Sequence, residues 1–499
     1  MSKATPIRSA RPLGLWLIPL LIGVLAVYAL WSSAGRFGHW PVYTTLFDLL
    51  AEGFRRGQLY LPVTPAPQLL AAANPYDRAN GRYWIIDATL HDGKWYLYWG
   101  PLPSLLQALT KSALGIHQLI GDQYLVLAFS LLSTGFGALL IEDIRLRMFS
   151  RVPRWVSALC ILALAFMNPV PYLVSTAGQY QAAIAGAQTF LVAGMWCAFR
   201  AVRGDLAPAH ARRWLLLAGV AFGAAASCRI SVTAAATLVA LLAACGAAWG
   251  RGWKALGVNA ACIAAAPLLS LSLLLLYNHA RFGRWLDFGM KEQVSYFEFK
   301  LSARYLLTNL YAYVLSPFEW TCQFPYALQS MAHGPKTPPS WVPRAPDYIF
   351  PEPISGFLAS APLTWLFPVP LLVSARHLRQ LRREAWRTYA FCALSFAVLG
   401  SISGILVLFV YAATMRYLGD FIYGLALLSV LGAFTWIGSR RSVLGQRLAC
   451  FVTAVLCVAS IALGLLLGYL GYNDHFPRFN PELHEALVKH LSVCSLFHR

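Results

Sequence analysis

The acidic residues of this sequence that could do chemistry stand unusually close to apolar ones. Asp87 lies in the segment YWIIDATL, between aromatic and aliphatic residues. A carboxylate in partly dry surroundings has a raised pKa and can act as a general base near neutral pH. Asp87 is therefore our first candidate for a catalytic base, although a carboxylate with a purely structural role fits the same pattern.

Asp48 is the second candidate base, and it falls on an expected amphipathic helix. The segment LFDLLAEGFRRGQLYL carries apolar residues at helical spacing, and Gly57 can end the helix. We expect Glu52, one turn after Asp48, to pair with Arg55 or Arg56 in solvent. Of these two carboxylates, Asp48 is then the better candidate for a role in a reaction.

A ribbon of aromatic and charged residues, LHDGKWYLYWGPLPSLL, follows Asp87. In an extended chain, Lys94 and Tyr98 lie on one face and Trp99 lies on the other. Two interpretations remain open: these three residues contact a sugar or a phosphate, or the ribbon belongs to the aromatic belt at a membrane surface. The Gly-Pro-x-Pro sequence ends the ribbon and begins a helix.

Two further segments combine arginines with an expected helix end. YNHARFGRWLDFG contains His279 and Arg281, where a guanidinium could bind a phosphate in a bidentate manner or anchor the helix to lipid headgroups. TMRYLGDF places Arg416 and Asp420 four residues apart. We expect these two side chains either to pair with each other or to leave Arg416 for a ligand.

The elements that must position these residues are membrane helices. The chain of 499 residues is 58% hydrophobic and only 12% charged, about half the charge of a soluble domain. Most of the net charge of +20 comes from clusters of arginine and lysine between apolar runs, as in cytoplasmic loops. We therefore predict an integral membrane protein, with the lipid bilayer as a partner and no nucleic acid.

Apolar runs of about 20 residues predict about eleven transmembrane helices. Their ranges are 13–31, 122–142, 153–170, 183–199, 214–228, 231–249, 256–277, 357–375, 388–412, 418–437 and 448–470. The fold class is an all-α polytopic membrane protein with a long first loop that contains amphipathic helices. The segment 303–318 is either another helix or one lying at the membrane surface.

These spans divide the chain into six parts. A cytoplasmic N-terminus and the first helix (1–31) precede a long loop (32–121) that holds the candidate site. Helices two to seven (122–277), a second large loop (278–356), helices eight to eleven (357–470) and a tail (471–499) follow. The tail contains NPELHEALVKHL, which predicts a short helix opened by Asn-Pro. Both large loops and the tail fall on one side of the membrane, opposite the basic clusters.

The sequence contains no CxxC pair, HExxH, GxSxG or glycine-rich phosphate loop. Most of the ten cysteines lie within apolar runs, where cysteine is usually a small hydrophobic residue. Cys322 and Cys494 alone fall on the loop side of the membrane. A disulfide between them is compatible with this placement but is not our expectation.

Together, the loop helix ending in GQLYL, then NPYD, DATLHDGKWYLYWGPLPSLL, YNHARFG and RYLGDF resemble bacterial membrane proteins of the GT-C glycosyltransferase superfamily. The resemblance covers most of the chain. It implies transfer of a sugar from a polyprenyl-phosphate donor to an envelope glycan or lipid acceptor on the periplasmic face of the inner membrane. It also implies a cytoplasmic N-terminus, a periplasmic tail and a divalent cation, Mg²⁺ or Mn²⁺.

The sequence departs from this superfamily at one point. The superfamily's catalytic acid belongs to an acidic pair soon after the first transmembrane helix, but residues 32–47 contain no Asp or Glu. Either Asp87 or Asp48 has taken this role, or the chemistry differs. Two alternatives from other classes therefore remain: a flippase or transporter of lipid-linked glycans, and a non-catalytic scaffold of envelope assembly.

Overall fold

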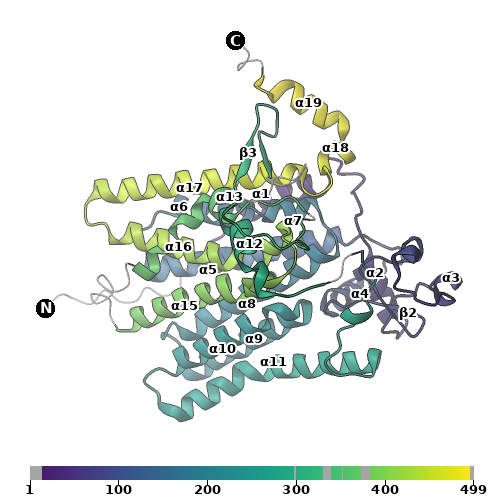
Figure 1. The fold of residues 1–499 in the computed structure, drawn as a ribbon. Coiled ribbons are helices and arrows are strands. Elements are labelled where there is room, and N and C mark those ends of the chain that lie inside the picture. Colours follow the sequence, from purple (N-terminus) through teal and green to yellow (C-terminus); the bar gives the residue numbers. More distant parts are fainter. Residues whose placement is uncertain (1–13, 297–298, 330–338, 351, 373–382, 495–499) are drawn as a thin grey trace.

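The computed structural model describes residues 14–296, 299–329, 339–350, 352–372 and 383–494. Long apolar helices run side by side in a bundle, and the loop elements gather at one end of it (Figure 1). The bundle helices are α1 (Leu17–Ser32), α5 (Gln123–Met148), α6 (Arg154–Phe166), α8 (Gln179–Val202), α9 (Pro208–Cys228), α10 (Thr233–Ala248), α11 (Gly252–Phe282), α15 (Arg383–Ile405), α16 (Ile422–Ser439) and α17 (Val443–Leu470).

The prediction of an all-α polytopic membrane protein is confirmed. Within the described residues, seven helices are long and apolar enough to cross a membrane, and three shorter apolar helices cover 17–32, 154–166 and 362–372. The helix α9 takes the place of the expected span at 214–228, and the short helix α13 (Phe357–Ser360) precedes the last of the three shorter ones. Every expected span therefore overlaps a helix, although several helices extend beyond the apolar run into polar residues.

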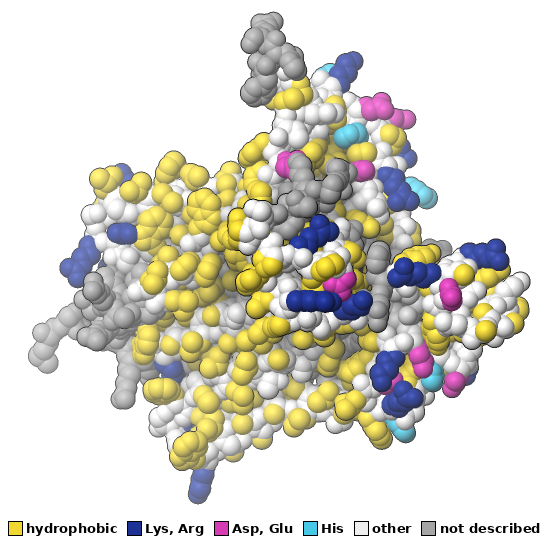
Figure 2. All heavy atoms as spheres, in the orientation of Figure 1, with side chains coloured by type: hydrophobic (Ala, Val, Ile, Leu, Met, Phe, Trp, Pro, Cys, Tyr) yellow, Lys and Arg dark blue, Asp and Glu magenta, His cyan; other side chains and the backbone are white. Residues whose placement is uncertain are grey.

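The two ends of the bundle differ in charge. In the view of Figure 2, the end that carries the loops and the tail shows acidic side chains among basic ones, whereas the charged side chains visible at the opposite end are basic. Helices α5 and α8 end in the basic clusters around Arg147 and Arg200. This asymmetry is the one that the positive-inside rule describes for membrane proteins.

The first loop folds as a compact unit on the end of the bundle. It consists of α2 (Leu46–Arg55), α3 (Pro67–Leu70), the 3₁₀ helix η1 (Arg78–Tyr83), the strands β1 (Thr89–His91) and β2 (Lys94–Tyr96), and α4 (Leu102–Leu114). The strands pair antiparallel, with His91 opposite Lys94. Asp92 and Gly93 form the turn, and both have positive φ, as a two-residue hairpin requires.

The loop packs on α8 and α9 through an apolar core and one close approach. Its core joins Phe47, Trp95 and Leu97 to Ala182 and Ala183 near the start of α8. Where the ribbon meets the end of α9, a Cβ on Gly100 would lie 1.9 Å from the Ser227 carbonyl oxygen. Only glycine allows this contact, so the Gly-Pro break fixes the position of the ribbon against the bundle.

The second loop and the tail are built from short elements. The expected helix at 303–318 consists of three short helical segments, η4 (Ala303–Tyr305), α12 (Leu306–Leu310) and η5 (Tyr311–Leu315), followed by the hairpin of β3 (Phe318–Trp320) and β4 (Ala327–Gln329). The tail forms α18 (His475–Phe479) and α19 (Pro481–Leu491), and the Asn480 side chain caps α19 by accepting from the Leu483 N–H.

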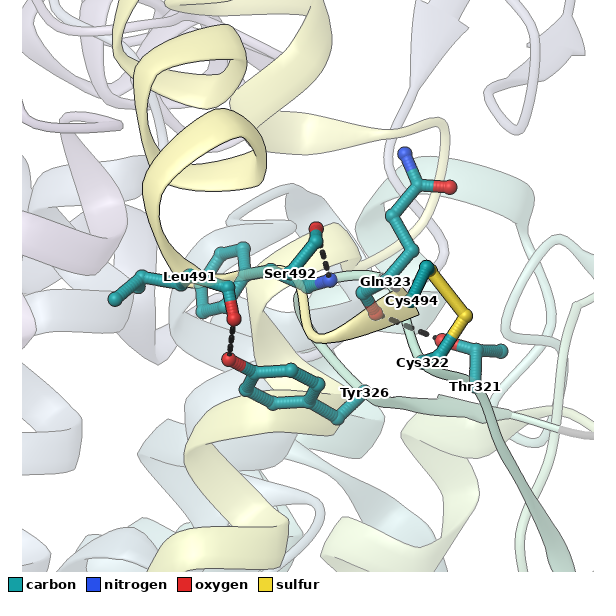
Figure 3. Close-up of a disulfide and its surroundings, with 8 residues drawn as sticks. Thr321, Cys322, Gln323, Tyr326, Leu491, Ser492 and Cys494 are labelled. Atoms are coloured by element: carbon teal, nitrogen blue, oxygen red, sulfur yellow. Dashed lines mark hydrogen bonds between the residues drawn. A yellow bond between two sulfur atoms is a disulfide. The ribbon is translucent and has the colours of Figure 1, made fainter. Parts of the chain in front are cut away.

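Cys322 and Cys494 form a disulfide, which corrects our expectation of two separate thiols. The sequence places them 172 residues apart, but the fold brings the end of α19 against the β3–β4 hairpin (Figure 3). The Val493 N–H donates to the Cys322 carbonyl at 2.9 Å, and the Phe324 N–H donates to Ser492 Oγ at 3.1 Å. These backbone contacts align the two cysteines.

Candidate functional site

Asp87 is held in an unusual backbone conformation immediately before β1. Its φ is +66°, in the left-handed region that a residue other than glycine seldom adopts. Such a conformation costs about 1–3 kcal/mol and persists only where the surroundings impose it. The second loop does so, because the Asp87 N–H donates to the Val294 carbonyl at 3.0 Å and the Val294 N–H donates to the Ala88 carbonyl at 2.9 Å.

Three side chains from two other parts of the chain donate to the Asp87 carboxylate. Gln179 Nε2, at the start of α8, lies 3.3 Å from one carboxylate oxygen, and Gln293 Nε2, from the second loop, lies 3.2 Å from the other. The Tyr180 hydroxyl also hydrogen-bonds this carboxylate. Asp87 is therefore the meeting point of the first loop, the second loop and a bundle helix.

Burial raises the pKa of the Asp87 carboxyl above its ordinary value. The hydrogen bond from Tyr180, the positive charge of Arg416 and the two glutamines act in the opposite direction and offset the effect of burial only in part. A carboxylate with a raised pKa is a better proton acceptor than one in water. The structure thus gives Asp87 the environment that its sequence neighbourhood predicted.

Arg416 packs against the ring of Tyr180. Its guanidinium stands 3.9 Å from the centroid of the Tyr180 ring, and it forms an ion pair with Glu352, whose side chain is 2% exposed. The Tyr172 hydroxyl donates to the other oxygen of Glu352 at 3.1 Å. Burial disfavours the charge of Arg416, but Glu352 and the neighbouring tyrosines together outweigh it and hold the pKa above its ordinary value.

Of the two alternatives for Arg416, its pairing with Asp420 is excluded by the structure. Both residues lie in the 3₁₀ helix η9 (Met415–Asp420), which has three residues per turn, so that positions four apart do not share a face. Asp420 pairs instead with Arg229, at 2.7 Å, in the connection between α9 and α10. Arg416 is consequently turned toward Tyr180 and Asp87.

Tyr98 and Trp99 join the same group through Tyr180. The Tyr98 hydroxyl donates to the Tyr180 hydroxyl at 3.2 Å, and the Trp99 ring lies 4.9 Å from the Tyr180 ring, edge to face. The two ring centroids of Tyr98 and Trp99 are 4.0 Å apart and stacked. The expected alternation of faces therefore ends where β2 ends, because side chains on opposite faces of an extended strand cannot stack on each other.

Glu352 is a member of this group that the sequence did not single out. It stands between two prolines, in FPEPI, in a loop that carries no regular pattern. A carboxylate in so apolar a segment was the available signal, the same one that identified Asp87. The sequence does not reveal that Glu352 pairs with Arg416, which lies 64 residues later.

Lys94, His279 and Arg281 are not brought into contact with Asp87. The exposed Lys94 ammonium lies 4.7 Å over the Tyr60 ring at the tip of the hairpin, and the His279 ring stacks on Trp285 at 4.4 Å. Arg281 is buried, and it donates to the Leu97 carbonyl at 2.6 Å. It therefore ties the end of α11 to the ribbon.

Asp48 belongs to a buried ion pair between α2 and α4. The ammonium of Lys111 lies 2.7 Å from Asp48 and 2.7 Å from Glu52, and the side chains of Lys111 and Asp48 are both fully buried. Glu52 pairs with Arg55 at 2.9 Å as expected, but the pair is not in solvent, since the two side chains are only 14% and 19% exposed. The second oxygen of Asp48 accepts from the Ile120 N–H, so this carboxylate has partners on both oxygens within the loop itself.

Among the described residues, no group of three or more His, Cys, Asp and Glu side chains could hold a metal ion. The polar atoms around Asp87 are amides and hydroxyls, and the nearby carboxylate of Glu352 is taken up by Arg416. These residues do not form a set of oxygen ligands for Mg²⁺ or Mn²⁺. Binding of a divalent cation therefore stays a prediction.

No family model and no curated protein sequence matches this chain. Among solved structures, the chain is similar to the Archaeoglobus fulgidus oligosaccharyltransferase in its apo form, at 12% identity and a TM-score of 0.43, over 94% of this chain and 59% of that one. It is also similar to ArnT from Cupriavidus metallidurans bound to undecaprenyl phosphate, at 12% identity and a TM-score of 0.45, over 95% of this chain and 78% of that one.

This chain thus spans less than two thirds of the length of the archaeal oligosaccharyltransferase. Both solved proteins are GT-C membrane glycosyltransferases, the superfamily that the sequence motifs resemble. Since both TM-scores lie below 0.5, these similarities carry no argument for an activity, which has to come from the residues around Asp87.

Proposed function

We propose that this chain is a membrane glycosyltransferase that moves a sugar from a polyprenyl-phosphate donor to a hydroxyl group of an envelope glycan or lipid. The observation that carries the proposal is the Asp87 carboxylate. It is held in a strained backbone by two loops, hydrogen-bonded by Gln179, Gln293 and Tyr180, and has a raised pKa. Asp87 combines both features at the point where the two loops meet a bundle helix, and strained, pKa-shifted groups in such places are candidates for function.

In the proposed reaction, one oxygen of Asp87 takes the proton from the acceptor hydroxyl. The acceptor oxygen attacks the anomeric carbon from the face opposite the phosphate. The bond between the anomeric carbon and the phosphate oxygen breaks, and the phosphate keeps the electron pair, so that polyprenyl phosphate leaves and the configuration inverts. Gln179 and Gln293 hold the carboxylate in position throughout, which limits the reorganisation that the step requires.

Arg416, Tyr98 and Trp99 have supporting roles in this proposal. The charge of Arg416, fixed by Glu352 beside Tyr180, lies close enough to Asp87 to lower its pKa and would favour the phosphate that develops charge. The stacked rings of Tyr98 and Trp99 offer an aromatic surface of the kind on which sugars stack. Lys94, His279 and Arg281 lie outside this group, and their predicted contact with the donor awaits a direct test.

We further propose that the loop end of the bundle faces the periplasm of a bacterial inner membrane. Two observations support this orientation. The arginine clusters gather at the opposite end, as they do on the cytoplasmic side of membrane proteins. The disulfide between Cys322 and Cys494 lies at the loop end, and such bonds persist in oxidising compartments.

The test is transfer of a tritium-labelled sugar from undecaprenyl-phosphate glucose, mannose or galactose to an envelope extract by the full chain in proteoliposomes. We expect Asp87→Asn to reduce transfer by about 10²-fold or more. Asp92→Asn is the matched control, because Asp92 also has positive φ but its side chain is 87% exposed at the hairpin tip. Full transfer by Asp87→Asn would overturn the assignment of the base, and transport of the lipid without transfer would favour a flippase.

A further inference from the structure

A second cluster of charged residues lies at the other end of the bundle, away from Asp87. Helix α8 begins beside Asp87 at Gln179 and ends at Val202. Its 24 residues span about 36 Å at 1.5 Å per residue. The cluster at the end of α8 therefore lies in the opposite headgroup layer from the proposed active site, and it owes nothing to the proposed transfer reaction.

Three guanidinium groups meet two carboxylates in this cluster. Arg147, from the last turn of α5, lies 2.8 Å from Asp205 and 3.3 Å from Asp143. Arg203, which follows α8, lies 2.7 Å from Asp205, and Arg200 lies 3.4 Å from Asp143. Among these five residues one positive charge remains without a carboxylate.

Hydrogen-bond donors are also left over. Within the described chain, Arg203 Nη1 and Arg200 Nε are buried and have no hydrogen-bond partner, although the Arg203 side chain is only 7% exposed. A buried donor without an acceptor is unfavourable, and more so when it is charged. The unpaired donors therefore indicate a cluster that lacks negative charge, which an anion at its exposed edge would supply.

The surroundings of the cluster suit a lipid. The Arg200 guanidinium stands 4.7 Å from the Trp214 ring and 5.4 Å from the Trp196 ring, which fix its position. The Trp196 N–H donates to Asp143 at 3.2 Å. Further along α9, Leu216 and Leu217 are about half exposed, as expected of side chains that contact acyl chains. A headgroup at the arginines would place its chains beside them.

We propose that Arg147, Arg200 and Arg203 form a binding site for a phosphate-bearing anion, namely the headgroup of an anionic phospholipid such as phosphatidylglycerol. The phosphate lies against the guanidinium groups of Arg147 and Arg200, whose side chains are 23% and 18% exposed, and the anion neutralises the excess positive charge. Guanidinium forks are well suited to phosphate in this way.

The test is native mass spectrometry of the full chain released from nanodiscs that contain equal amounts of phosphatidylglycerol and phosphatidylcholine. We expect the wild type to retain phosphatidylglycerol preferentially. We expect Arg203→Gln to weaken this retention about ten-fold, because it removes the excess positive charge of the cluster. The matched control is Arg212→Gln with Arg213→Gln, two exposed arginines at the same end of the bundle, which should change retention less than about two-fold.

Asp205→Asn provides a test that misfolding cannot imitate. Removing this carboxylate frees Arg203 from its ion pair and leaves Arg147 only its longer contact with Asp143, so retention of phosphatidylglycerol should rise rather than fall. Equal losses in Arg203→Gln and in the control variant would overturn the site, because they would indicate general attraction to a basic surface. So would unchanged retention in Arg203→Gln.

Two additional measurements are needed. The first distinguishes a lipid from free phosphate as the source of the anion, and the second distinguishes a failure of this proposal from a failure of the proposed transfer reaction. If inorganic phosphate binds the detergent-solubilised chain and phosphatidylglycerol does not displace it, the ligand is free phosphate and the assignment to lipid is overturned. Asp87→Asn should retain phosphatidylglycerol like the wild type. A loss of transfer without a loss of lipid binding therefore bears on the active site alone.

Discussion

Asp87 combines a buried carboxylate with a left-handed backbone, and specific partners offset both costs. Val294 fixes the backbone through one hydrogen bond with Asp87 and one with Ala88, and the amides of Gln179 and Gln293 fix the carboxylate. These three partners come from segments that the chain contributes more than 90 residues later. The carboxylate that we propose as the base is therefore held in place before any substrate arrives, which is the property that electrostatic catalysis requires.

The pKa of Asp87 predicts a pH dependence with a definite sign. Transfer needs the ionised carboxylate, so activity is lost as the pH falls through a pKa that burial holds above the ordinary value. Gln293 lowers this pKa by donating to the ionised form. Gln293→Leu should therefore move the acidic limb of the kcat/KM profile to higher pH. A limb that stays in place or moves to lower pH would contradict the role of Gln293.

Two exposed residues, Lys94 in the hairpin of the first loop and His279 in α11, are expected to contribute little to transfer. Lys94 and His279 contact only aromatic rings at the surface and lie outside the group around Asp87. We expect Lys94→Ala and His279→Ala to reduce transfer less than about three-fold, as for the loss of a weak exposed cation–π contact. Initial rates of transfer at saturating and at limiting donor concentrations check this expectation. A loss of about 10²-fold in either variant would indicate that the residue contacts the donor.

At the scale of elements, the ion pair between α2 and α4 decides the shape of the first loop. Lys111 is a fully buried lysine, and it contacts Asp48 and Glu52 from the neighbouring helix. The sequence offered Asp48 as a candidate base because the nearby arginines, Arg55 and Arg56, were expected to pair with Glu52. The partner lies 63 residues further along the chain and becomes visible only when α4 packs on α2.

Lys111→Met tests this structural role. Removing one member of a buried ion pair leaves an uncompensated charge, so we expect unfolding to become easier by about 3–5 kcal/mol. Lys94→Met, the same change at an exposed lysine, is the control. The pair Lys111→Met with Asp48→Asn should recover much of the stability and should retain transfer. A stable but inactive double variant would show that Asp48 takes part in the reaction.

At the scale of the whole molecule, the tail closes a covalent loop over the end of the bundle. Helices α18 and α19 pack on the segment that follows α1: His475 accepts from or donates to Tyr43 at 2.7 Å, and Asn480 donates to the Ala34 carbonyl at 2.8 Å. The disulfide joins the far end of α19 to the second loop. The tail is thus connected to the first loop by hydrogen bonds and to the second loop by the disulfide.

The disulfide predicts how many cysteine thiols react with an alkylating reagent before and after reduction. Of ten cysteines, eight are free in the structure, so alkylation of the denatured, unreduced chain should label eight, and reduction should expose two more. Cys322→Ser should lower stability by about 2–5 kcal/mol, as is typical for the loss of a native disulfide. Labelling of all ten cysteines without reduction would show that the bond does not form.

Much of the architecture could be predicted from the sequence because it depends on local composition. Apolar runs, glycine stops and Asn-Pro starts are local signals, and they gave the helices, the loop helix α2, the tail helix α19 and the Asp92-Gly93 turn. Helix ends were less accurate, since the bundle allows α8 and α11 to continue into polar residues. The 3₁₀ geometry of η9, which separates Arg416 from Asp420, has no comparable local signal.

The sequence by itself determined that this protein is a membrane bundle with a charged, aromatic first loop, and that Asp87 lies in apolar surroundings. Burial of apolar runs in lipid is decided by residue type alone, so it can be read along the chain. Only the tertiary structure decided which charges meet: Asp87 with Gln179 and Gln293, Arg416 with Glu352, and Asp48 with Lys111. An ion pair depends on distance in space, and a chain position does not fix that distance.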